Sequence, residues 1–307
     1  MAIFTNRPFL GKQNSFGFPL MSVLQNSIHK SKMKPQVVGI VGFGNEGRGF
    51  WSPFFKKLRY TVLSSDKAED NQWIVDQASI VVLATPMHIT PELIRSLRFR
   101  PDQRVIAVVG EWSATKEALL EIPADSMLLH RMCGPIADMH GQNLIMHTVK
   151  SSSWENDCWF KAIVGEIGAN TVASNPDEHD RHIGVTQSLL RLVLICFFVA
   201  LLELKVSLKG LRAFSSPPFR IFLLVMCRIL GQGAELCFDM LSSNRFAKEA
   251  ISAMQGALTN VADLIEKGDR AGFAALFASF HSHVEPDKIW RANQAFGVAI
   301  GQGLDKW

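Results

Sequence analysis

The sequence predicts an α/β protein of two domains, in which a doubly wound parallel sheet is followed by an all-helical domain. The chain has 307 residues, about twice the length of a common domain. Short β-rich segments alternate with helical segments up to residue 174, which is typical of a parallel sheet covered on both faces. After Asn175 and Pro176 the strand patterns nearly vanish and helical periodicity takes over.

Composition excludes several classes of protein. Hydrophobic residues make up 48% of the chain and charged residues 20%, which indicates a packed core and excludes a mostly disordered chain. The formal net charge is +4 and residues 1–45 carry +5, so the remainder is nearly neutral and lacks the basic face that nucleic-acid binding requires. The five cysteines are widely spaced and contain no CxxC pair, which argues against disulfides and a metal site and favours the reducing cytoplasm.

Two segments raise the question of targeting or membrane contact. Residues 1–34 are basic and lack periodicity, and we expect a loosely ordered extension. Organellar targeting is an alternative that we do not favour, because arginine is scarce there. The apolar stretch 192–202 has only 11 residues, against the about 20 of a membrane span. We therefore expect a buried core helix in a soluble protein without membrane contact.

The predicted organisation is an extension at 1–34, a sheet domain at 35–174 and a helical domain at 175–307. The strands are expected at residues 37–41, 61–63, 79–84, 104–109, 126–129, 144–148 and 171–173. The helices are expected at residues 47–58, 91–97, 116–121, 154–167, 180–206, 220–230, 245–267 and 271–284. The helix at 180–206 is apolar around most of its circumference, which suggests burial on several sides, including by a second subunit.

A glycine motif follows the first predicted strand and opens a helix. Gly42, Gly44 and Gly47 have the spacing that lets backbone approach a pyrophosphate at a helix N-terminus. Asp66 follows 19 residues later, where a carboxylate can bind an adenosine ribose. The motif predicts a Rossmann domain that binds NAD; NADP is less favoured, although Ser64, Ser65 and Lys67 leave room for it. The predicted cofactor-binding residues are Gly42, Phe43, Gly44, Asn45, Glu46, Gly47 and Asp66, with Thr85 and Pro86 of the later segment ATPMHIT.

Each of several polar residues in apolar surroundings can be interpreted as structural or as functional. His130 ends a predicted strand on the face where such sheets bind ligands, but a lone histidine there is more often structural. A metal site built from His130, Cys133 and His140 has little support. Arg191 and Arg228 interrupt apolar helices, either as salt-bridge partners or as clamps for a substrate carboxylate.

Over residues 36–285 these motifs, in this order, resemble the prephenate dehydrogenase family. The resemblance rests on the glycine turn, ATPMHIT at 84–90, His130-x-Met-x-Gly-Pro135, His179-Asp180, SSPPFR at 215–220 and DMLSSNR at 239–245. The closest match is to the dehydrogenase part of the bifunctional chorismate mutase–prephenate dehydrogenases.

The resemblance implies NAD-dependent oxidative decarboxylation of prephenate to 4-hydroxyphenylpyruvate, a step of tyrosine biosynthesis, by a homodimer joined through the helical domain. It implies that His130 accepts a hydrogen bond from the C4 hydroxyl and must be neutral, so activity should fall as the pH drops through about 6.5. It implies that Arg228 grips a substrate carboxylate. The remaining implied site residues are Ser113 as a catalytic residue and Gln187, Arg191 and His179 as substrate-binding residues.

Three positions depart from the family pattern. Arg131 stands where the family has proline, Arg191 where it often has a second histidine, and Ser113 only loosely matches the family's S-V-K segment. The two arginines add positive charge, which would strengthen binding of a dianion or indicate a different substrate, arogenate or amino-deoxyprephenate. A catalytically degenerate NAD-binding sensor is a further alternative.

Overall fold

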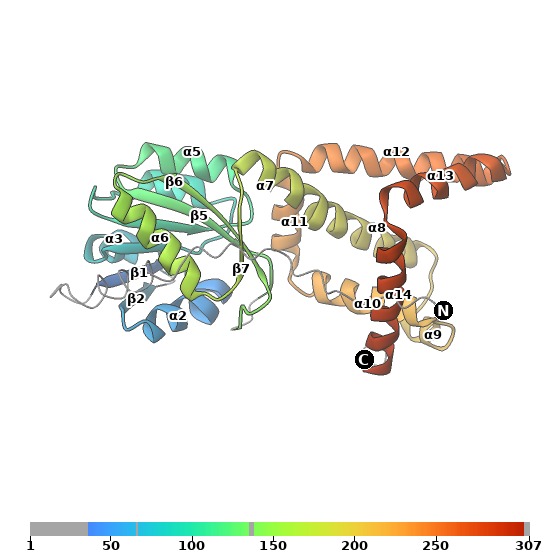
Figure 1. Ribbon diagram of the computed structural model, residues 1–307, viewed down its shortest axis with the longest axis horizontal. Coiled ribbons are helices and arrows are strands. Elements are labelled where there is room, and N and C mark those ends of the chain that lie inside the picture. Colours follow the sequence, from blue (N-terminus) through green and yellow to red (C-terminus); the bar gives the residue numbers. More distant parts are fainter. Residues whose placement is uncertain (1–35, 66, 135–137, 304–307) are drawn as a thin grey trace, which may run out of the picture.

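The structure is a computed structural model that describes residues 36–65, 67–134 and 138–303. A seven-stranded sheet with its helices forms one half, which ends at Ala173, and the helices from Pro176 onward form the other (Figure 1). We call these the sheet half and the helical half. The predicted extension at 1–34 and the predicted ribose ligand Asp66 lie outside the described residues.

The sheet has the strand order β2-β1-β3-β4-β5-β6-β7, and neighbouring strands are parallel except β5 and β6. Its strands are β1 (Val37–Val41), β2 (Thr61–Ser65), β3 (Ile80–Leu83), β4 (Arg104–Val108), β5 (Asp125–Arg131), β6 (Asn143–Lys150) and β7 (Asn170–Ala173). All seven predicted strands are confirmed. The expected doubly wound, mainly parallel sheet is also confirmed. β5 and β6 are antiparallel because only a short connection joins them, whereas a parallel crossover would need a dozen or more residues.

Two loops meet where the strand order reverses. β1 lies between β2 and β3, so the chain leaves β1 toward one side of the sheet and later resumes at β3 on the other. The turn at residues 42–47 follows β1, the loop at residues 84–90 follows β3, and the Ala84 N–H donates to the Val41 carbonyl (2.8 Å). Open α/β sheets bind ligands outside the carboxyl ends of their strands at such a switch point.

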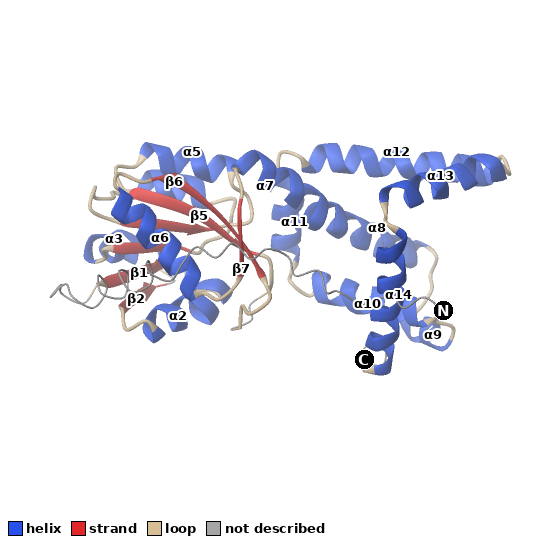
Figure 2. Ribbon diagram, in the orientation of Figure 1, coloured by secondary structure: helices blue, strands red, loops and turns tan. Residues whose placement is uncertain are grey.

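Helices cover both faces of the sheet (Figure 2). One face packs against η1 (Gly47–Trp51), α2 (Ser52–Lys57) and α6 (Trp154–Glu166), and the other against α3 (Asn71–Gln77), α4 (Thr90–Ser96) and α5 (Ser113–Glu121). η1 is a π-helical turn directly before Pro53, and proline disfavours a regular helical turn there because it lacks an N–H. Helix α3 is absent from the sequence prediction, because its short run offers less than two clear turns of periodicity.

The helical half is built on a continuous helix of 28 residues formed by α7 (Pro176–Ile183), η3 (Gly184–Leu189) and α8 (Leu190–Glu203). It begins four residues earlier than predicted, because the Asn175 side chain caps it by accepting the Glu178 N–H and Pro176 fits the first helical turn. The π-helical turn η3 widens the helix beside the cleft described below, as such turns often do at functional sites.

Six further helices complete this half. They are α9 (Leu208–Ala213), α10 (Pro217–Leu230), α11 (Ala234–Ser242), α12 (Ala247–Glu266), α13 (Arg270–His283) and α14 (Pro286–Gly301). Helices α9, α11 and α14 were not predicted. Pro286 follows the end of α13 and occupies the first turn of a new helix, a position that suits proline.

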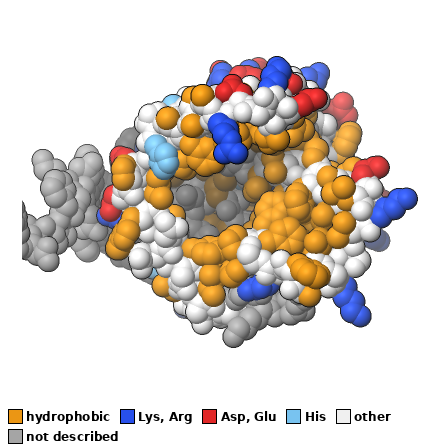
Figure 3. Space-filling view, turned by 90° about the vertical axis from the view of Figure 1, so that its right-hand side faces the viewer, with side chains coloured by type: hydrophobic (Ala, Val, Ile, Leu, Met, Phe, Trp, Pro, Cys, Tyr) orange, Lys and Arg blue, Asp and Glu red, His pale blue; other side chains and the backbone are white. Residues whose placement is uncertain are grey.

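The helical half leaves much apolar surface uncovered. The continuous helix meets the length and composition of a membrane span, and only 22% of its most apolar window is buried. Of the burial expected on several sides of this helix, the chain itself provides only a part. Exposed apolar side chains on the other helices of this half include Leu258, Ile265, Phe277, Phe280, Trp290 and Val298. Figure 3 shows apolar side chains gathered around a hollow at the end of the molecule away from the sheet.

Close packing of α3 on β1 depends on Gly39. A Cβ atom at Gly39 would lie 2.6 Å from Cγ2 of Ile74 and 3.0 Å from Cβ of Ala78. We expect Gly39→Ala to lower the free energy of unfolding by about 1–3 kcal/mol through overpacking. In the control Gly49→Ala the new methyl group meets no atom within 4 Å, and stability should be unchanged or slightly higher. Urea unfolding measures both, and equal stability of the two variants would contradict the packing.

Candidate active site

A cleft of about 1130 Å³ opens between the two halves. Its walls are the loops that follow β1, β3, β4 and β5 in the sheet half, and residues of η3, α8, α10 and α11 in the helical half. It brings together most of the predicted site residues. Those that line it are Gly44, Asn45, Glu46, Thr85, Pro86, His130, Gln187, Arg191 and Arg228.

The glycine turn has the shape that a dinucleotide requires. Gly42 has φ +89°, and a Cβ there would lie 2.5 Å from the carbonyl oxygen of Ala84. A Cβ at Gly47 would collide with the backbone of Gly42, whereas one at Gly44 meets nothing within 4 Å. Gly42 and Gly47 therefore close the turn, and Gly44 leaves open space in the cleft before a helical N-terminus. That arrangement fits a pyrophosphate. Phe43 packs against the core instead of lining the cleft.

The loop at residues 84–90 is held rigidly beside this turn. The hydroxyl group of Thr90 lies 2.9 Å from the carbonyl oxygen of Pro86 and 2.8 Å from the hydroxyl of Thr85. His88 reaches the helical half, where its Nδ1 lies 2.7 Å from Oδ2 of Asp239. The loop thereby links the cofactor side of the cleft to α11.

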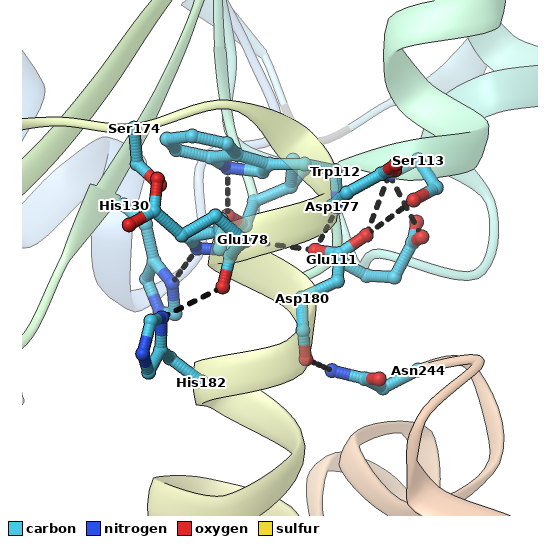
Figure 4. A network of polar contacts seen from close by, with 12 residues as sticks. Glu111, Trp112, Ser113, His130, Ser174, Asp177, Glu178, Asp180, His182 and Asn244 are labelled. Carbon is cyan, nitrogen blue, oxygen red and sulfur yellow. Dashed lines mark hydrogen bonds and ion pairs between the residues drawn. The ribbon is translucent and has the colours of Figure 1, made fainter.

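His130 is the first member of a chain of three buried side chains (Figure 4). Its Nδ1 lies 2.9 Å from Nε2 of His179, and Nδ1 of His179 lies 2.7 Å from Oδ1 of Asp180. The Gln187 amide nitrogen, which only donates, lies 3.4 Å from Nε2 of His130. His130 Nε2 is therefore the acceptor, its Nδ1–H donates to His179, and the Nδ1–H of His179 donates to the carboxylate. The chain keeps a lone pair of His130 at the wall of the cleft.

Asp180 anchors this chain from the first turns of the helical half. It is fully buried and accepts the backbone N–H groups of Trp112 (3.0 Å) and Ser113 (2.9 Å) and the Ser113 hydroxyl (2.5 Å). Burial raises the pKa of Asp180, but the hydrogen bonds from His179, Ser113 and Trp112 outweigh it and hold that pKa below its ordinary value. The Trp112 ring stacks on His179 with centroids 3.7 Å apart, which fixes the imidazole plane.

Burial makes His130 a neutral acceptor. Removal from water, together with the neighbouring His179 and Arg191, lowers the pKa of His130 to about 3 despite the opposing charge of Asp180. The expected titration near pH 6.5 is therefore wrong for the free protein, because a buried imidazolium would lose its hydration without a direct carboxylate partner.

A second buried acid adjoins this chain. Burial and the charge of Asp180 raise the pKa of Glu111 to about 7. Its Oε1 accepts the backbone N–H groups of Ser113 (2.9 Å) and Ala114 (3.3 Å) at the start of α5. Glu111 therefore gains or loses its proton near neutral pH.

Two predicted site residues lie behind the cleft wall. Neither Ser113 nor His179 is among the described residues that line the cleft, and their hydrogen bonds go to Asp180 and His130. The roles predicted for Ser113 in catalysis and for His179 in substrate contact therefore do not match their positions. Both hold His130 in place. The residue that the sequence prediction missed is Asp180, although the adjacent His179-Asp180 pair was among the family motifs.

Arg131 also lines the cleft, but its charge is already paired. Its side chain is 1% exposed, its Nη1 donates to Oε2 of Glu46 (2.9 Å), and its guanidinium lies 3.7 Å from the ring centroid of Phe50. The charge that Arg131 was expected to add for an acidic substrate is therefore balanced by a carboxylate of the glycine turn.

Arg191 and Arg228 bring two guanidinium groups to the same cleft. Arg191 is 5% exposed, and its Nη2 donates to Oε1 of Gln232 (2.9 Å). The guanidinium group of Arg228 reaches the loop after β5. It lies so close to Gly134 that a Cβ atom at that position would overlap it. Three further residues line the cleft that the sequence did not predict as site residues: His88, Gln232 and Asp239. No pattern in the sequence indicated Gln232, because its role depends on a contact between distant segments.

Comparison with known proteins identifies the helical half directly. Residues 175–279 match the family model described as prephenate dehydrogenase, dimerization domain. The chain is 32% identical over 205 residues to the 4-amino-4-deoxyprephenate dehydrogenase of Streptomyces pristinaespiralis, covering 66% of this chain and 69% of that protein. It is 23% identical over 273 residues to a probable arogenate/prephenate dehydrogenase of Methanocaldococcus jannaschii, covering 80% of this chain and only 60% of that relative.

Solved structures agree on the fold. The prephenate dehydrogenase of A. aeolicus, determined in complex with hydroxyphenyl propionate and NAD+, matches with a TM-score of 0.62 at 18% identity, over 82% of this chain and 98% of that one. The match spans both the sheet half and the helical half described above. The chain belongs to the prephenate dehydrogenase family.

Proposed function

We propose that this chain is an NAD-dependent dehydrogenase that oxidatively decarboxylates prephenate to 4-hydroxyphenylpyruvate, a step of tyrosine biosynthesis. The observation that carries the proposal is a buried, neutral His130 whose Nε2 accepts at the wall of a cleft that also holds two guanidinium groups. A hydroxylated dicarboxylate matches this combination of one acceptor and two cations.

The atom balance of the reaction explains why a weakly basic histidine is suitable. The hydrogen on C4 leaves as hydride, and the C1 carboxylate leaves as carbon dioxide while the ring becomes aromatic. A dianion and NAD+ then give a monoanion, carbon dioxide and NADH, so no proton is released overall. The C4 hydroxyl keeps its hydrogen and becomes the phenol, and the site needs an acceptor that strengthens its hydrogen bond as C4–O gains carbonyl character.

His130 meets this requirement through its neighbours. Its Nε2 can accept the C4 hydroxyl because the hydrogen bond to His179 holds its own N–H on the far side. Its low pKa keeps the imidazole neutral, so it does not repel the positive charge that develops on the substrate when hydride departs. Arg228 can bind a carboxylate with its planar fork of donors.

NAD fits the glycine turn through the open space over Gly44 and the N–H groups of the following helix. When bound, NAD would supply the acceptor for the C4 hydride. Glu46 lies at that turn with its charge balanced by Arg131, which limits repulsion of the pyrophosphate. The A. aeolicus prephenate dehydrogenase was determined with NAD+ bound, which supports NAD as the cofactor.

A second candidate substrate is 4-amino-4-deoxyprephenate. The relative named for that substrate is 32% identical to this chain, and a neutral C4 amine can donate to His130 Nε2 as a hydroxyl does. Arogenate is the third candidate, because the archaeal relative carries that name beside prephenate.

The apolar surface of the helical half supports a homodimer as part of the proposal. The family model names this segment a dimerization domain, and a second copy would cover side chains that one chain exposes. The five free cysteines of the chain favour a reducing compartment, and we propose the cytoplasm.

The test is an absorbance assay for reduced cofactor with prephenate, arogenate and 4-amino-4-deoxyprephenate, each with NAD and with NADP. We expect prephenate-dependent reduction of NAD. Reduction of NADP alone would reject the cofactor, and a rate on arogenate alone would reject the substrate. Folded protein that binds NAD but is silent on all three compounds would contradict an enzyme and favour a sensor.

The low pKa of His130 predicts that kcat/KM does not fall on the acid side of the pH profile. The histidine accepts only when neutral, and with a pKa of about 3 it stays neutral well below pH 6.5. We expect kcat/KM for prephenate to stay constant from about pH 8 down to about pH 5, where other groups begin to titrate.

The Glu111→Gln variant provides the control for this profile, because Glu111 is a buried group beside Asp180 whose pKa of about 7 lies in this range. A break near pH 7 that disappears in Glu111→Gln belongs to that carboxyl group. A break at pH 6–7 that persists in the variant would contradict a neutral, buried His130.

His179 is expected to position His130, and a matched pair of variants tests this. In His179→Phe the new ring can still stack on Trp112 but cannot accept the Nδ1–H of His130. We therefore expect kcat to fall about 10- to 100-fold, while the dissociation constant for NAD stays unchanged. The control His182→Phe changes an exposed residue on the same helix and should have little effect. Steady-state rates and NAD titration check both; equal kcat values would exclude the positioning role.

A further inference from the structure

Arg191 is a buried cation in the cleft. The structure shows no carboxylate within ion-pair distance of it among the residues described in 36–303. Its Nη1 donates to the carbonyl oxygen of Gln187 (3.2 Å) and its Nη2 to the amide oxygen of Gln232 (2.9 Å). Its Nε is buried without a hydrogen-bond partner. Since an uncompensated buried charge is costly, this arrangement points to an anion that completes it.

The other charges of the cleft do not compensate Arg191. The carboxylate of Glu46 pairs with Arg131, and that of Asp239 pairs with His88. Burial lowers the pKa of Arg191, the neighbouring Cys237 thiol raises it, and the charge of Arg228 lowers it further. Neither guanidinium group forms an ion pair with a carboxylate of the described residues. Glu235 also lines the cleft and forms no ion pair with another described residue.

The three candidate substrates differ in charge at the end of the ring that bears C1. Prephenate and 4-amino-4-deoxyprephenate carry two carboxylates there, one on the ring and one on a keto-acid side chain. Arogenate carries the same two carboxylates, but an ammonium group replaces the keto oxygen. Two cations attract the first pair of compounds through both carboxylates, whereas the ammonium group of arogenate would be repelled.

We propose that Arg191 determines substrate specificity: it binds the side-chain carboxylate and makes the site select a keto-acid side chain over an α-amino-acid side chain. The inference rests on the proposed function and narrows it. Arg191 does not discriminate at C4, so prephenate and 4-amino-4-deoxyprephenate are equivalent for this residue. The departure from the family's histidine at position 191 thereby acquires a chemical role, because guanidinium stays charged at every pH at which the protein folds.

Equilibrium binding to the complex with NADH tests the proposal without turnover. Calorimetric titrations with prephenate and arogenate are compared for the wild type, Arg191→Gln and Arg191→Lys. We expect the wild type to bind prephenate at least 10-fold more tightly than arogenate. In Arg191→Gln the dissociation constant for prephenate should rise about 100-fold. The value for arogenate should change less than about 3-fold, because lost attraction and relieved repulsion oppose each other.

Three controls separate this role from a structural one. Arg181→Gln, on the same continuous helix but stacked on Phe246 outside the cleft, should leave both dissociation constants unchanged. Arg191→Lys keeps the charge and should keep the preference for prephenate with weaker binding. Glu235→Gln tests a carboxylate of the cleft lining that could recognise an ammonium ion. Thermal unfolding of each variant verifies that it is folded.

The outcomes are distinct. Equal weakening of both ligands in Arg191→Gln would overturn the proposal. So would tight arogenate binding that is lost in Glu235→Gln, because Glu235 would then recognise the side chain. Selective, Arg191-dependent binding without reduction of NAD on any compound would support the inference and reject the proposed function. Binding of neither compound in the presence of NADH would reject both.

Discussion

The structure depends most on the buried carboxylate of Asp180. It lies in the first turns of the helical half, yet its partners are the start of α5 in the sheet half and the histidine that leads to His130. One carboxylate therefore joins the two halves and fixes the protonation pattern of both histidines. Its burial is tolerated because several donors satisfy its oxygens, and removing it would leave those donors and His179 unpaired in the interior.

The second organising principle is charge compensation across the cleft. Arg131 balances Glu46 at the glycine turn, and His88 meets Asp239 between the loop after β3 and helix α11. These contacts join the walls of the cleft. Arg191 and Arg228 of the helical half form no ion pair with a carboxylate of the described residues, and Glu235 of the same half forms none with a described base. The helical wall therefore carries the two guanidinium groups that suit carboxylates.

Much of the fold followed from local patterns. The seven strands, the glycine turn and the long helices repeat their signals over several residues, and each signal reports a local preference for burial on one face or both. The short helices α3, α9 and α11 lacked that redundancy. The pairing of Arg131 was missed because its partner Glu46 is 85 residues away in the chain, and the position of Ser113 because its partner Asp180 is 67 residues away.

The sequence by itself determined the class of fold, the family, and the residue types of the site: glycines at the turn, His130 on the strand and arginines on the helices. Each of these depends on the order of residues along a short segment, where chain connectivity limits the geometry. Tertiary structure alone decided which of these residues face the cleft, which histidine supports the other, and which arginine is left without a carboxylate. Those properties depend on contacts between segments tens of residues apart, and burial, which sets the pKa of His130 and leaves the charge of Arg191 uncompensated, exists only after the segments have packed.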